Sequence, residues 1–447
     1  MLPIEEPGIS VGILTDKKIR FELYGDFSVF GFKDTFSGVF TAELKDDLIL
    51  CKSTKHKIEV SKEIEFIPSD PVSESFLIRD VIIGNKFHWE RKEKQRFIYS
   101  LRLLKVGEKI VAINCIPLER YLISVISSEM SAKSSIELLK AQAVIARSWV
   151  LAQISRSEEL KDSKETHKTA IEFKDELVKW YDREDHKLYD VCADDHCQRF
   201  QGVTKIISEA SFSAVEQTEG IVILNAGNVC DARYSKCCGG ITESFENVWE
   251  PVKHPYLMSV VDYKYEPENY KLDFSDEENS VKWIRGNPAA YCNTSDVKIL
   301  THILVDYDRE TKDFFRWKVE YTQDEIAALI KEKSKIDFGN IIDLVPVERG
   351  DSARLVKMKI VGTNRTLTVG KELEIRRLLS KTHLYSSAFI VKKIGKNIPE
   401  KFILYGAGWG HGVGLCQIGA AVMAEKGYNF DEVLLHYFSN SELKKIY

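Results

Sequence analysis

The chain has 447 residues, more than one hydrophobic core usually holds, so we expect two or three domains. Hydrophobic residues make up 44% of it, which excludes a largely disordered protein. There are 63 basic and 68 acidic residues, giving a formal net charge of -5, and no basic block stands out. The composition therefore predicts no nucleic-acid partner.

No apolar run is as long as a membrane-spanning helix, and the sequence does not open with the pattern of a signal peptide. A strand pattern begins almost at once, from Ile9 to Leu14. This start is expected of a cytoplasmic protein, and equally of an exported protein whose leader is missing from the sequence.

The first quarter of the chain is predicted to be β-rich. Residues 9–115 alternate apolar and polar positions in short runs that charged turns separate. The last strand pair is expected at 98–103 and 110–113, around the turn Gly107-Glu108.

Helical spacing replaces this alternation after Pro117, a residue suited to the first turn of a helix. A second helix is expected to open at Ser134, with Glu137 three residues later in a capping-box pattern. Residues 155–187 are strongly charged, and we expect them to form an exposed helix or an insertion.

Both patterns occur in the rest of the chain. Residues 203–262 are predicted to form strands, and residues 317–321 a strand that is followed by a helix at 323–332. The tail contains a glycine-rich loop and two short helices, and Asn429 with Glu432 is expected to cap the second helix.

These elements predict an α+β, multi-domain protein, with a β-rich N-terminal region followed by a mixed α/β region. The expected parts are a β-rich domain at 1–95, the first part of a core at 96–262, a mixed α/β inserted or accessory subdomain at 263–400, and the C-terminal part of the core at 401–447.

Glu129 lies in the break between the two expected helices. A carboxylate at such a turn can face a cleft while the helices bury their own apolar faces. Partial desolvation would raise its pKa, so that it could act as a general acid near neutral pH. The alternative is a solvated surface glutamate, the more common state of an acidic residue.

A glycine-rich run, Gly-Ala-Gly-Trp-Gly-His-Gly-Val-Gly, occupies residues 406–414. Glycine at alternate positions permits backbone conformations that side chains forbid, and it lets a ligand approach closely. Trp409 could stack on a sugar ring, and His411 could donate to hydroxyls or transfer a proton. A phosphate loop is disfavoured because no Lys-Ser or Lys-Thr follows, whereas a ligand loop and a structural turn both stay open.

The nine cysteines are an odd number, so at least one is unpaired within a monomer. Two thiols and two imidazoles, those of His186, Cys192, His196 and Cys197, form a chemically suitable tetrahedral zinc set. The alternatives are a Cys192–Cys197 disulfide and buried free thiols. His167 is the alternative to His186 as a fourth ligand.

Together these stretches resemble the stage II sporulation protein D / amidase enhancer (SpoIID/LytB) family, from about residue 110 to residue 447. The strongest similarities lie in the segment from Pro-Leu-Glu-Arg-Tyr-Leu to Ser-Glu-Met and in the Leu-Lys-Ala-Gln-Ala-Val run after it. The glycine-rich tail and a Cys-Gly-Gly-Ile-Thr-Glu segment also resemble family motifs. In this chain the motifs stand at residues 117–130, 139–148, 238–243 and 406–428, with a weaker similarity at 350–354.

The resemblance implies a lytic transglycosylase, which cleaves bacterial glycan strands between N-acetylmuramic acid (MurNAc) and N-acetylglucosamine (GlcNAc). Glu129 matches the family's glutamate and would protonate the glycosidic oxygen. The C6 hydroxyl of the muramic sugar would then close onto C1 and leave a 1,6-anhydro end. One carboxylate serves as acid and later as base, unlike the carboxylate pair of most glycoside hydrolases. The alternative function is a non-catalytic, glycan-binding activator of a cell-wall amidase.

We expect Glu129 to lie in a groove near Arg147 or Gln142, Tyr234 and His411. Arg147 would orient the carboxylate or stabilise developing charge, and Tyr234 and His411 would hold the sugar. The further expected glycan contacts are Gly239, Gly240, Trp409, Gly410 and Gln417.

The resemblance also favours a structural zinc ion at Cys192, His196 and Cys197, with His186 as the fourth ligand. It implies an extracytoplasmic location, in the periplasm or cell envelope, with peptidoglycan glycan strands and a cell-wall amidase as partners. Two positions depart from the family pattern. Cys416 stands where the family usually has serine, and Cys237 precedes the Cys-Gly-Gly where a small polar residue is common.

Overall fold

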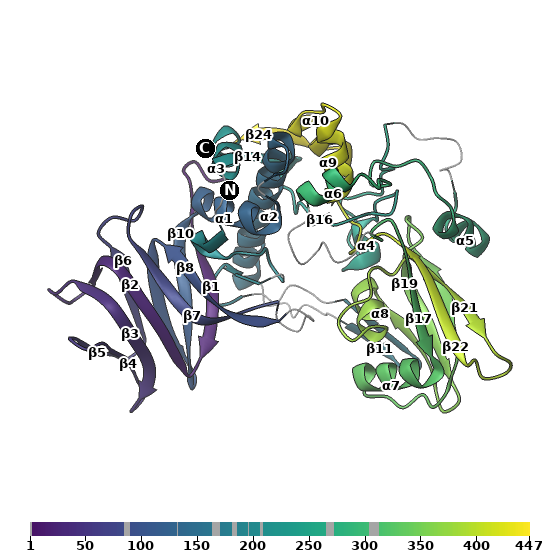
Figure 1. The fold of residues 1–447 in the computed structure, drawn as a ribbon, viewed down its shortest axis with the longest axis horizontal. Helices are drawn as coiled ribbons and strands as arrows, with labels where there is room; N and C mark the ends of the chain where they lie inside the picture. The colour runs from purple at the N-terminus through teal and green to yellow at the C-terminus, as the bar shows by residue number, and fades with distance from the viewer. Residues whose placement is uncertain are drawn as a thin grey trace.

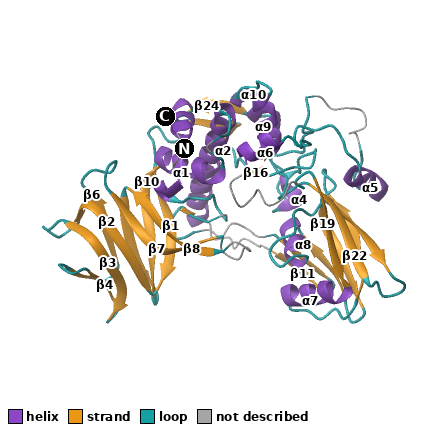
Figure 2. Ribbon diagram, in the orientation of Figure 1, coloured by secondary structure: helices purple, strands orange, loops and turns teal. Residues whose placement is uncertain are grey.

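A computed structural model of the chain describes residues 2–84, 90–131, 133–162, 170–180, 186–194, 196–205, 209–264, 272–303 and 313–447. Its main parts are a β-sheet lobe, a central group of helices and a second, mixed lobe (Figure 1). The helices of the central group lie between the two groups of strands (Figure 2). Mixed helices and strands confirm the predicted α+β composition.

The first lobe is one large sheet with the strand order β13-β1-β10-β9-β6-β2-β3-β4-β5, and β7 pairs with β2 and β8. Ile19, Phe21 and Leu23 alternate with more exposed residues along β2, as a sheet with one face on the core requires. The strands are β1 (Gly8–Asp16), β2 (Lys18–Val29), β3 (Phe36–Lys45), β4 (Leu48–Lys52), β5 (Lys57–Val60), β6 (Glu63–Pro68), β7 (Ser75–Ile83), β8 (Arg91–Ile98), β9 (Ser100–Val106), β10 (Lys109–Pro117) and β13 (Val191–Cys192).

The expected hairpin around Gly107 is confirmed, because β9 and β10 pair antiparallel across it. β1 pairs with β10 over most of its length, so the sheet continues past residue 95, where the first domain was expected to end. The chain therefore returns to its first strand before it enters the helices.

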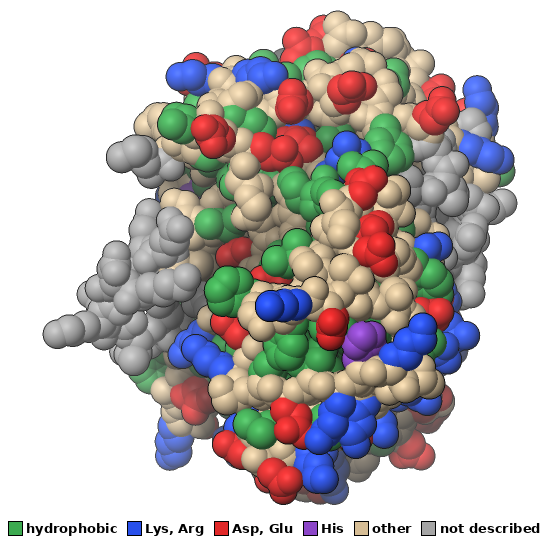
Figure 3. Space-filling model, turned by 90° about the vertical axis from the view of Figure 1, so that its left-hand side faces the viewer, with side chains coloured by type: hydrophobic (Ala, Val, Ile, Leu, Met, Phe, Trp, Pro, Cys, Tyr) green, Lys and Arg blue, Asp and Glu red, His purple; other side chains and the backbone are tan. Residues whose placement is uncertain are grey.

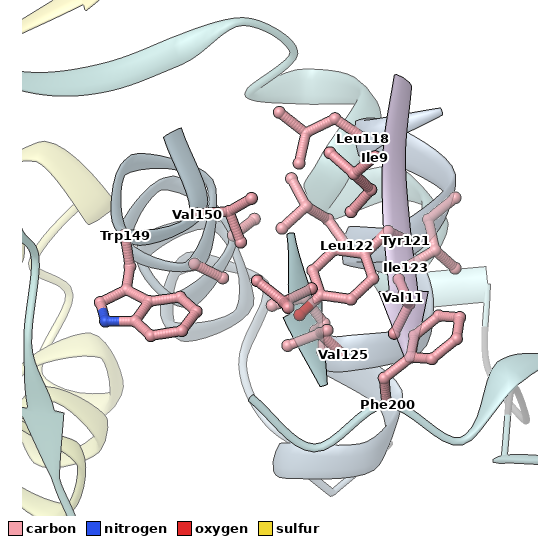
Figure 4. Packing of buried hydrophobic residues seen from close by; sticks show 14 of the residues in the cluster. Ile9, Val11, Leu118, Tyr121, Leu122, Ile123, Val125, Trp149, Val150 and Phe200 are labelled. Carbon is pink, nitrogen blue, oxygen red and sulfur yellow. The ribbon is translucent and has the colours of Figure 1, made fainter. Parts of the chain in front are cut away.

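The central helices close the core of this lobe. Helix α1 (Leu118–Glu129) packs between β1 and α2 (Ile136–Asp162), and Figure 4 shows Tyr121 and Leu122 filling the space between Val150 of α2 and Val11 of β1. The same continuous core includes the C-terminal helices α9 (Gln417–Glu425) and α10 (Phe430–Tyr437). The two ends of the sequence thus contribute to one hydrophobic core.

The prediction of strands throughout 203–262 is wrong for its first part. A short 3-10 helix, η1 (Gly202–Lys205), and the helix α3 (Glu209–Gln217) stand there. α3 buries Ser211, Ala214 and Val215, which have the i, i+3, i+4 spacing of one helical face. The strands that do follow are short: β14 (Ile221–Asn225), β15 (Asn228–Val229) and β16 (Tyr234–Ser235), with β23 (Leu415–Cys416) and β24 (Glu442–Lys445) as C-terminal partners.

The second lobe contains two sheets, of orders β11-β12-β20-β19-β18 and β17-β22-β21. Two short strands from the charged segment 155–187 complete the first sheet, so this segment is partly an insertion into the second lobe. The elements are β11 (Ala170–Phe173), β12 (Glu176–Lys179), α4 (Phe245–Val248), α5 (Glu277–Arg285), β17 (Arg316–Thr322), α7 (Gln323–Ser334), β18 (Ile341–Arg349), β19 (Leu355–Gly362), β20 (Thr366–Gly370), α8 (Glu372–Leu378), β21 (Phe389–Ile394) and β22 (Lys401–Ala407). The helix between α5 and β17, α6 (Val297–Ile303), lies instead against α9 in the central group (Figure 1).

Local signals placed several helix ends correctly. The expected strand and helix after residue 316 are confirmed as β17 and α7, and Asn429 with Glu432 forms the expected capping box of α10. The box expected at Ser134 is wrong. α2 begins at Ile136, and Glu137 instead binds Lys140 and the backbone N–H of Phe430.

Lys and Arg side chains are interspersed with Asp and Glu on the face of the molecule shown in Figure 3, with hydrophobic side chains scattered among them. Among the residues described, no helix is both long and apolar enough to span a membrane.

Candidate functional site

Glu129 is the last residue of α1, and the chain continues in extended conformation at Met130. Its side chain is half-buried, and Oε1 accepts a hydrogen bond of 3.0 Å from the backbone N–H of Arg199. Arg199 lies two residues after Cys197. The candidate metal loop therefore holds the candidate general acid directly.

Tyr121, on the same helix, is buried close to several of the predicted site residues. Its ring stacks on Phe200 with centroids 5.0 Å apart, and Figure 4 shows both rings beside β1. Burial raises the pKa of Tyr121 well above its ordinary value, and negative charge on four nearby groups raises it further: Cys197, Tyr234, Cys192 and Glu129. Glu129, Tyr234 and the two thiols are thus all close enough to act electrostatically on one buried hydroxyl.

The ligand atoms of His186, Cys192, His196 and Cys197 all lie within 4.8 Å of one another. Sγ of Cys197 is 3.3 Å from Nε2 of His186 and 3.5 Å from Nδ1 of His196. Zinc bonds of about 2.3 Å to sulfur and about 2.0–2.1 Å to nitrogen give tetrahedral edges of about 3.4–3.8 Å, so this donor set fits a tetrahedral ion. All nine cysteines are unpaired, and His167 lies outside the described residues.

The electrostatics of the set also suit a metal. A hydrogen bond from the Cys197 thiol is the largest effect on the pKa of Cys192 and, with those of His186 and His196, holds it far below its ordinary value despite burial. A thiolate is the form of cysteine that binds metal.

The sheet edge carries this loop. β13 pairs parallel with β1, with Cys192 opposite Gly12. A Cβ at Gly12 would lie 2.4 Å from Cζ of Tyr189, so only glycine admits the tyrosine ring there. One oxygen of Asp190 accepts from both the N–H and the hydroxyl of Ser10, at 2.8 and 2.7 Å. These contacts attach the residues around Asp190 to the sheet. The rest of the loop is held by contacts among the candidate ligands.

The glycine-rich loop is wrapped around the buried side chain of Arg354. The guanidinium donates to the carbonyls of Cys238 and Gly410, at 3.0 and 3.2 Å. A Cβ at Gly412 would lie 2.4 Å from Cζ of Arg354, and one at Gly408 would lie 2.9 Å from Nη2. Of the two interpretations left open by the sequence, the structural turn accounts for these glycines.

Replacing Gly412 with alanine is expected to destabilise the fold by about 1–2 kcal/mol for the left-handed backbone and by about 1–3 kcal/mol more for the overpacked guanidinium. Gly227→Ala is the matched control, because Gly227 has the same φ of +81° but open space where the Cβ would go. Urea unfolding measures both. Equal losses for the two variants would show that the contact with Arg354 carries no energy.

Gly239 and Gly240 pack closely against other segments. A Cβ at Gly239 would lie 2.9 Å from the backbone nitrogen of Gly408, and one at Gly240 would lie 2.9 Å from Cζ2 of Trp283. The two glycines therefore let the Cys-Gly-Gly turn contact the glycine-rich loop and α5. Their expected glycan contact stays a prediction.

Trp409 is held inside an aromatic group. Its ring stacks on Tyr385 with centroids 4.1 Å apart, and Phe314 lies 4.9 Å away. Its backbone N–H and carbonyl both pair with Cys237. Because Tyr385 covers one face of the indole, that face cannot stack on a sugar as expected.

His411 is engaged by the protein itself. Nδ1 accepts from the N–H of Val413 at 3.0 Å, and the ring packs against Trp249 with centroids 4.9 Å apart. Burial, followed by the charges of nearby arginines, lowers its pKa well below the ordinary value, and a hydrogen bond with the backbone of Tyr234 only partly opposes this. A neutral His411 therefore positions Tyr234 and the loop.

We expect His411 to stay neutral from pH 8 to pH 5, so the ¹⁵N shifts of its ring should be constant over this range. In the unfolded chain a histidine takes up a proton near pH 6.5. Since the unfolded state then binds more protons, this residue lowers folding stability as pH falls, by up to about 1.4 kcal/mol per pH unit. A ring titration between pH 6 and 7 would contradict this assignment.

Two glutamines expected at the site have different surroundings. Nε2 of Gln417, at the start of α9, lies 3.8 Å from Sδ of Met130, so the C-terminal segment reaches the residue next to Glu129. Gln142 is fully buried, and its amide atoms make no hydrogen bond within the described part of the chain. Contact of either with a glycan stays a prediction.

Arg147 does not contact Glu129 through its hydrogen bonds. The guanidinium forms a bidentate pair with Glu119, at 2.6 and 2.7 Å, and donates to the carbonyl of Ile221 at 2.9 Å. The side chain is fully buried. These contacts join α1, α2 and β14, so the structure gives Arg147 a structural place where catalysis was expected.

Sequence reasoning missed a buried carboxylate behind the glycine-rich loop. Glu243 accepts from the backbone N–H groups of Asp351 and Ser352, at 2.9 and 3.2 Å, and its own N–H binds the carbonyl of Gly412. Glu243 and Arg354 both lie in segments that resemble family motifs, at 238–243 and 350–354. That resemblance was the one signal in the sequence that could have pointed to them. Their partners lie in distant segments.

A cleft of about 800 Å³ lies elsewhere, lined among others by Ile241, Ser244, Arg349 and His436. None of the predicted catalytic or metal residues lines it.

Two family models match the chain: one described as stage II sporulation protein, at residues 106–224, and one described as a domain of unknown function (DUF8618), at residues 243–414. An uncharacterized protein of Brachyspira hyodysenteriae is 27% identical over 77% of this chain and 71% of its own length. Stage II sporulation protein D of Bacillus amyloliquefaciens is 23% identical over 75% and 76%. The amidase enhancer of Bacillus subtilis is 25% identical over 52% of this chain, which spans only 32% of that relative.

Proposed function

The chain belongs to the SpoIID/LytB family, and from this premise we propose that it is a lytic transglycosylase-like enzyme that acts on peptidoglycan. Its substrate is the glycan strand, cut between MurNAc and GlcNAc, and its place is extracytoplasmic. The observation that supports this best is Glu129, which stands in the family motif at the end of α1 with its carboxylate held by Arg199.

In this proposal Glu129 donates a proton to the glycosidic oxygen as the bond from that oxygen to C1 of MurNAc breaks. The C6 hydroxyl of the same sugar forms the new bond to C1 and returns a proton to Glu129. The N–H of Arg199 fixes the orientation of the carboxyl group. Tyr234 lies in the same neighbourhood and binds the sugar, with His411 as its positioning residue.

We also propose that His186, Cys192, His196 and Cys197 hold a zinc ion. Four protein ligands close such a site and leave no position for a reactive water, so the ion cross-links the loop and performs no chemistry. Its effect on the reaction passes through the backbone of the loop to Arg199, and from there to Glu129.

The test is incubation of the purified full chain with purified peptidoglycan, followed by mass spectrometry of the soluble products. Fragments with 1,6-anhydro-MurNAc ends are expected, and heat-inactivated protein is the control. Fragments with ordinary reducing ends, or no fragments at all, would overturn the assignment.

The alternative is a non-catalytic activator of a cell-wall amidase, and the specific support for it is the relative named amidase enhancer. Adding a cell-wall amidase to the assay distinguishes the two functions. An activator would accelerate release of peptide stems by the amidase while producing no anhydro ends, and Glu129→Gln would accelerate it equally.

A further inference from the structure

A second group of candidate ligands lies buried under the glycine-rich loop. Side-chain atoms of Cys238, Asp262, Cys292 and Cys416 all lie within 4.8 Å of one another. Their residues are 2%, 0%, 1% and 0% exposed, respectively. Cys238 opens the Cys-Gly-Gly turn and Cys416 precedes α9, so the group joins segments far apart in the sequence.

The spacing of these atoms suits a tetrahedral ion. Sγ of Cys238 and Sγ of Cys292 are 3.6 Å apart, which is far too long for a disulfide. Zinc bonds of about 2.3 Å to sulfur and about 2.0–2.2 Å to a carboxylate oxygen give tetrahedral edges of about 3.5–3.8 Å. The group needs only small shifts to close around an ion.

Backbone N–H groups already point at the sulfurs. Cys416 Sγ accepts from the N–H of Cys238 at 3.2 Å and from that of Gly419, in the first turn of α9, at 3.4 Å. Cys238 Sγ accepts from Gly240 at 3.4 Å. Such donors stabilise thiolates, and outer hydrogen bonds of this kind orient the ligands of metal sites.

The carboxylate in this group has polar partners but no balancing cation. Asp262 accepts from the N–H of Cys292 at 2.8 Å and from the hydroxyl of Tyr437 at 2.6 Å. Neither an ion pair nor a hydrogen bond joins Asp262 to a Lys or Arg within the described residues. A buried carboxylate beside three thiols is costly, and a divalent ion would supply the missing positive charge.

We propose that Cys238, Asp262, Cys292 and Cys416 bind a second, structural zinc ion, separate from the His186–Cys197 site. Three sulfurs and one oxygen make a closed donor set that favours zinc over the oxygen-seeking ions of magnesium or calcium. The ion would join the Cys-Gly-Gly turn, the segment around Cys292 and the start of α9. This inference does not depend on the proposed glycan cleavage.

The test is metal analysis of the full chain purified without added zinc, on wild type and three variants. We expect two equivalents of zinc in wild type and one in Cys197→Ser, which removes a ligand of the first site only. Cys292→Ser should also lose one equivalent. Cys230→Ser is the matched control, a fully buried thiol that belongs to neither ligand set, and it should keep both.

If Cys292→Ser does not fold, the second site can still be tested in Cys197→Ser, in which the first site is disabled. Cobalt substituted into Cys197→Ser should give thiolate-to-cobalt charge-transfer absorption, and adding Asp262→Cys should strengthen it by about one third. The proposal is overturned if Cys197→Ser holds no metal and gives no such absorption. Iron with acid-labile sulfide, or a Cys238–Cys292 disulfide found after alkylation in denaturant, overturns it equally.

Discussion

Glu129→Gln is expected to abolish formation of 1,6-anhydro ends, with a rate loss of at least about 10²–10⁴-fold, because the amide cannot deliver or take back the proton. The glutamine carbonyl can still accept the hydrogen bond that Arg199 gives to Oε1, so the loop keeps its place. Binding of glycan strands and the melting temperature should therefore stay as in wild type. The measurements are product mass spectrometry, pull-down with insoluble peptidoglycan, and calorimetry.

Glu425→Gln is the control for this variant, since it makes the same change at an exposed position at the end of α9. It should cleave like wild type. If Glu129→Gln cleaves as fast as its control, Glu129 is not the general acid. If it loses binding as well as cleavage, the residue holds the glycan and does not transfer a proton.

Loss of metal from the His186–Cys197 site is expected to lower the melting temperature and the cleavage rate together. Structural zinc contributes about 10–16 kcal/mol in small zinc-finger peptides at neutral pH. In the proposed site the ion would support one loop that the sheet also anchors through Asp190 and β13, so we expect a smaller effect than in such peptides. Cleavage falls because Arg199 no longer holds Glu129.

Cys197→Ser and treatment with a strong chelator test this by calorimetry and by the cleavage assay. Cys115→Ser is the control, because that half-buried cysteine of β10 belongs to neither ligand set. Glu129→Gln should keep the zinc. This variant therefore separates removal of the general acid from disruption of the metal-binding loop. If neither Cys197→Ser nor the chelator changes the melting temperature, the four residues bind no structural metal and are free thiols and ordinary histidines.

The sequence by itself determined the local elements and identified four candidate metal ligands that the structure brings together. The strand and helix after residue 316 and the cap at Asn429 follow from hydrophobic spacing and capping residues, which act within one turn. Glu129 could be placed at a helix end, and His186 to Cys197 could be proposed as ligands, because each depends on neighbours in the chain. The helix α3 was missed because its apolar face spans too few residues to give a clear period.

Only the tertiary structure decided which distant groups meet. Arg147 pairs with Glu119 in place of Glu129, and Tyr385 occupies one face of Trp409. Arg354 explains glycines that stand more than fifty residues later. Each outcome depends on contacts between segments far apart in the sequence. A buried ionic group must find a partner wherever the fold supplies one, and local spacing carries no information about that partner.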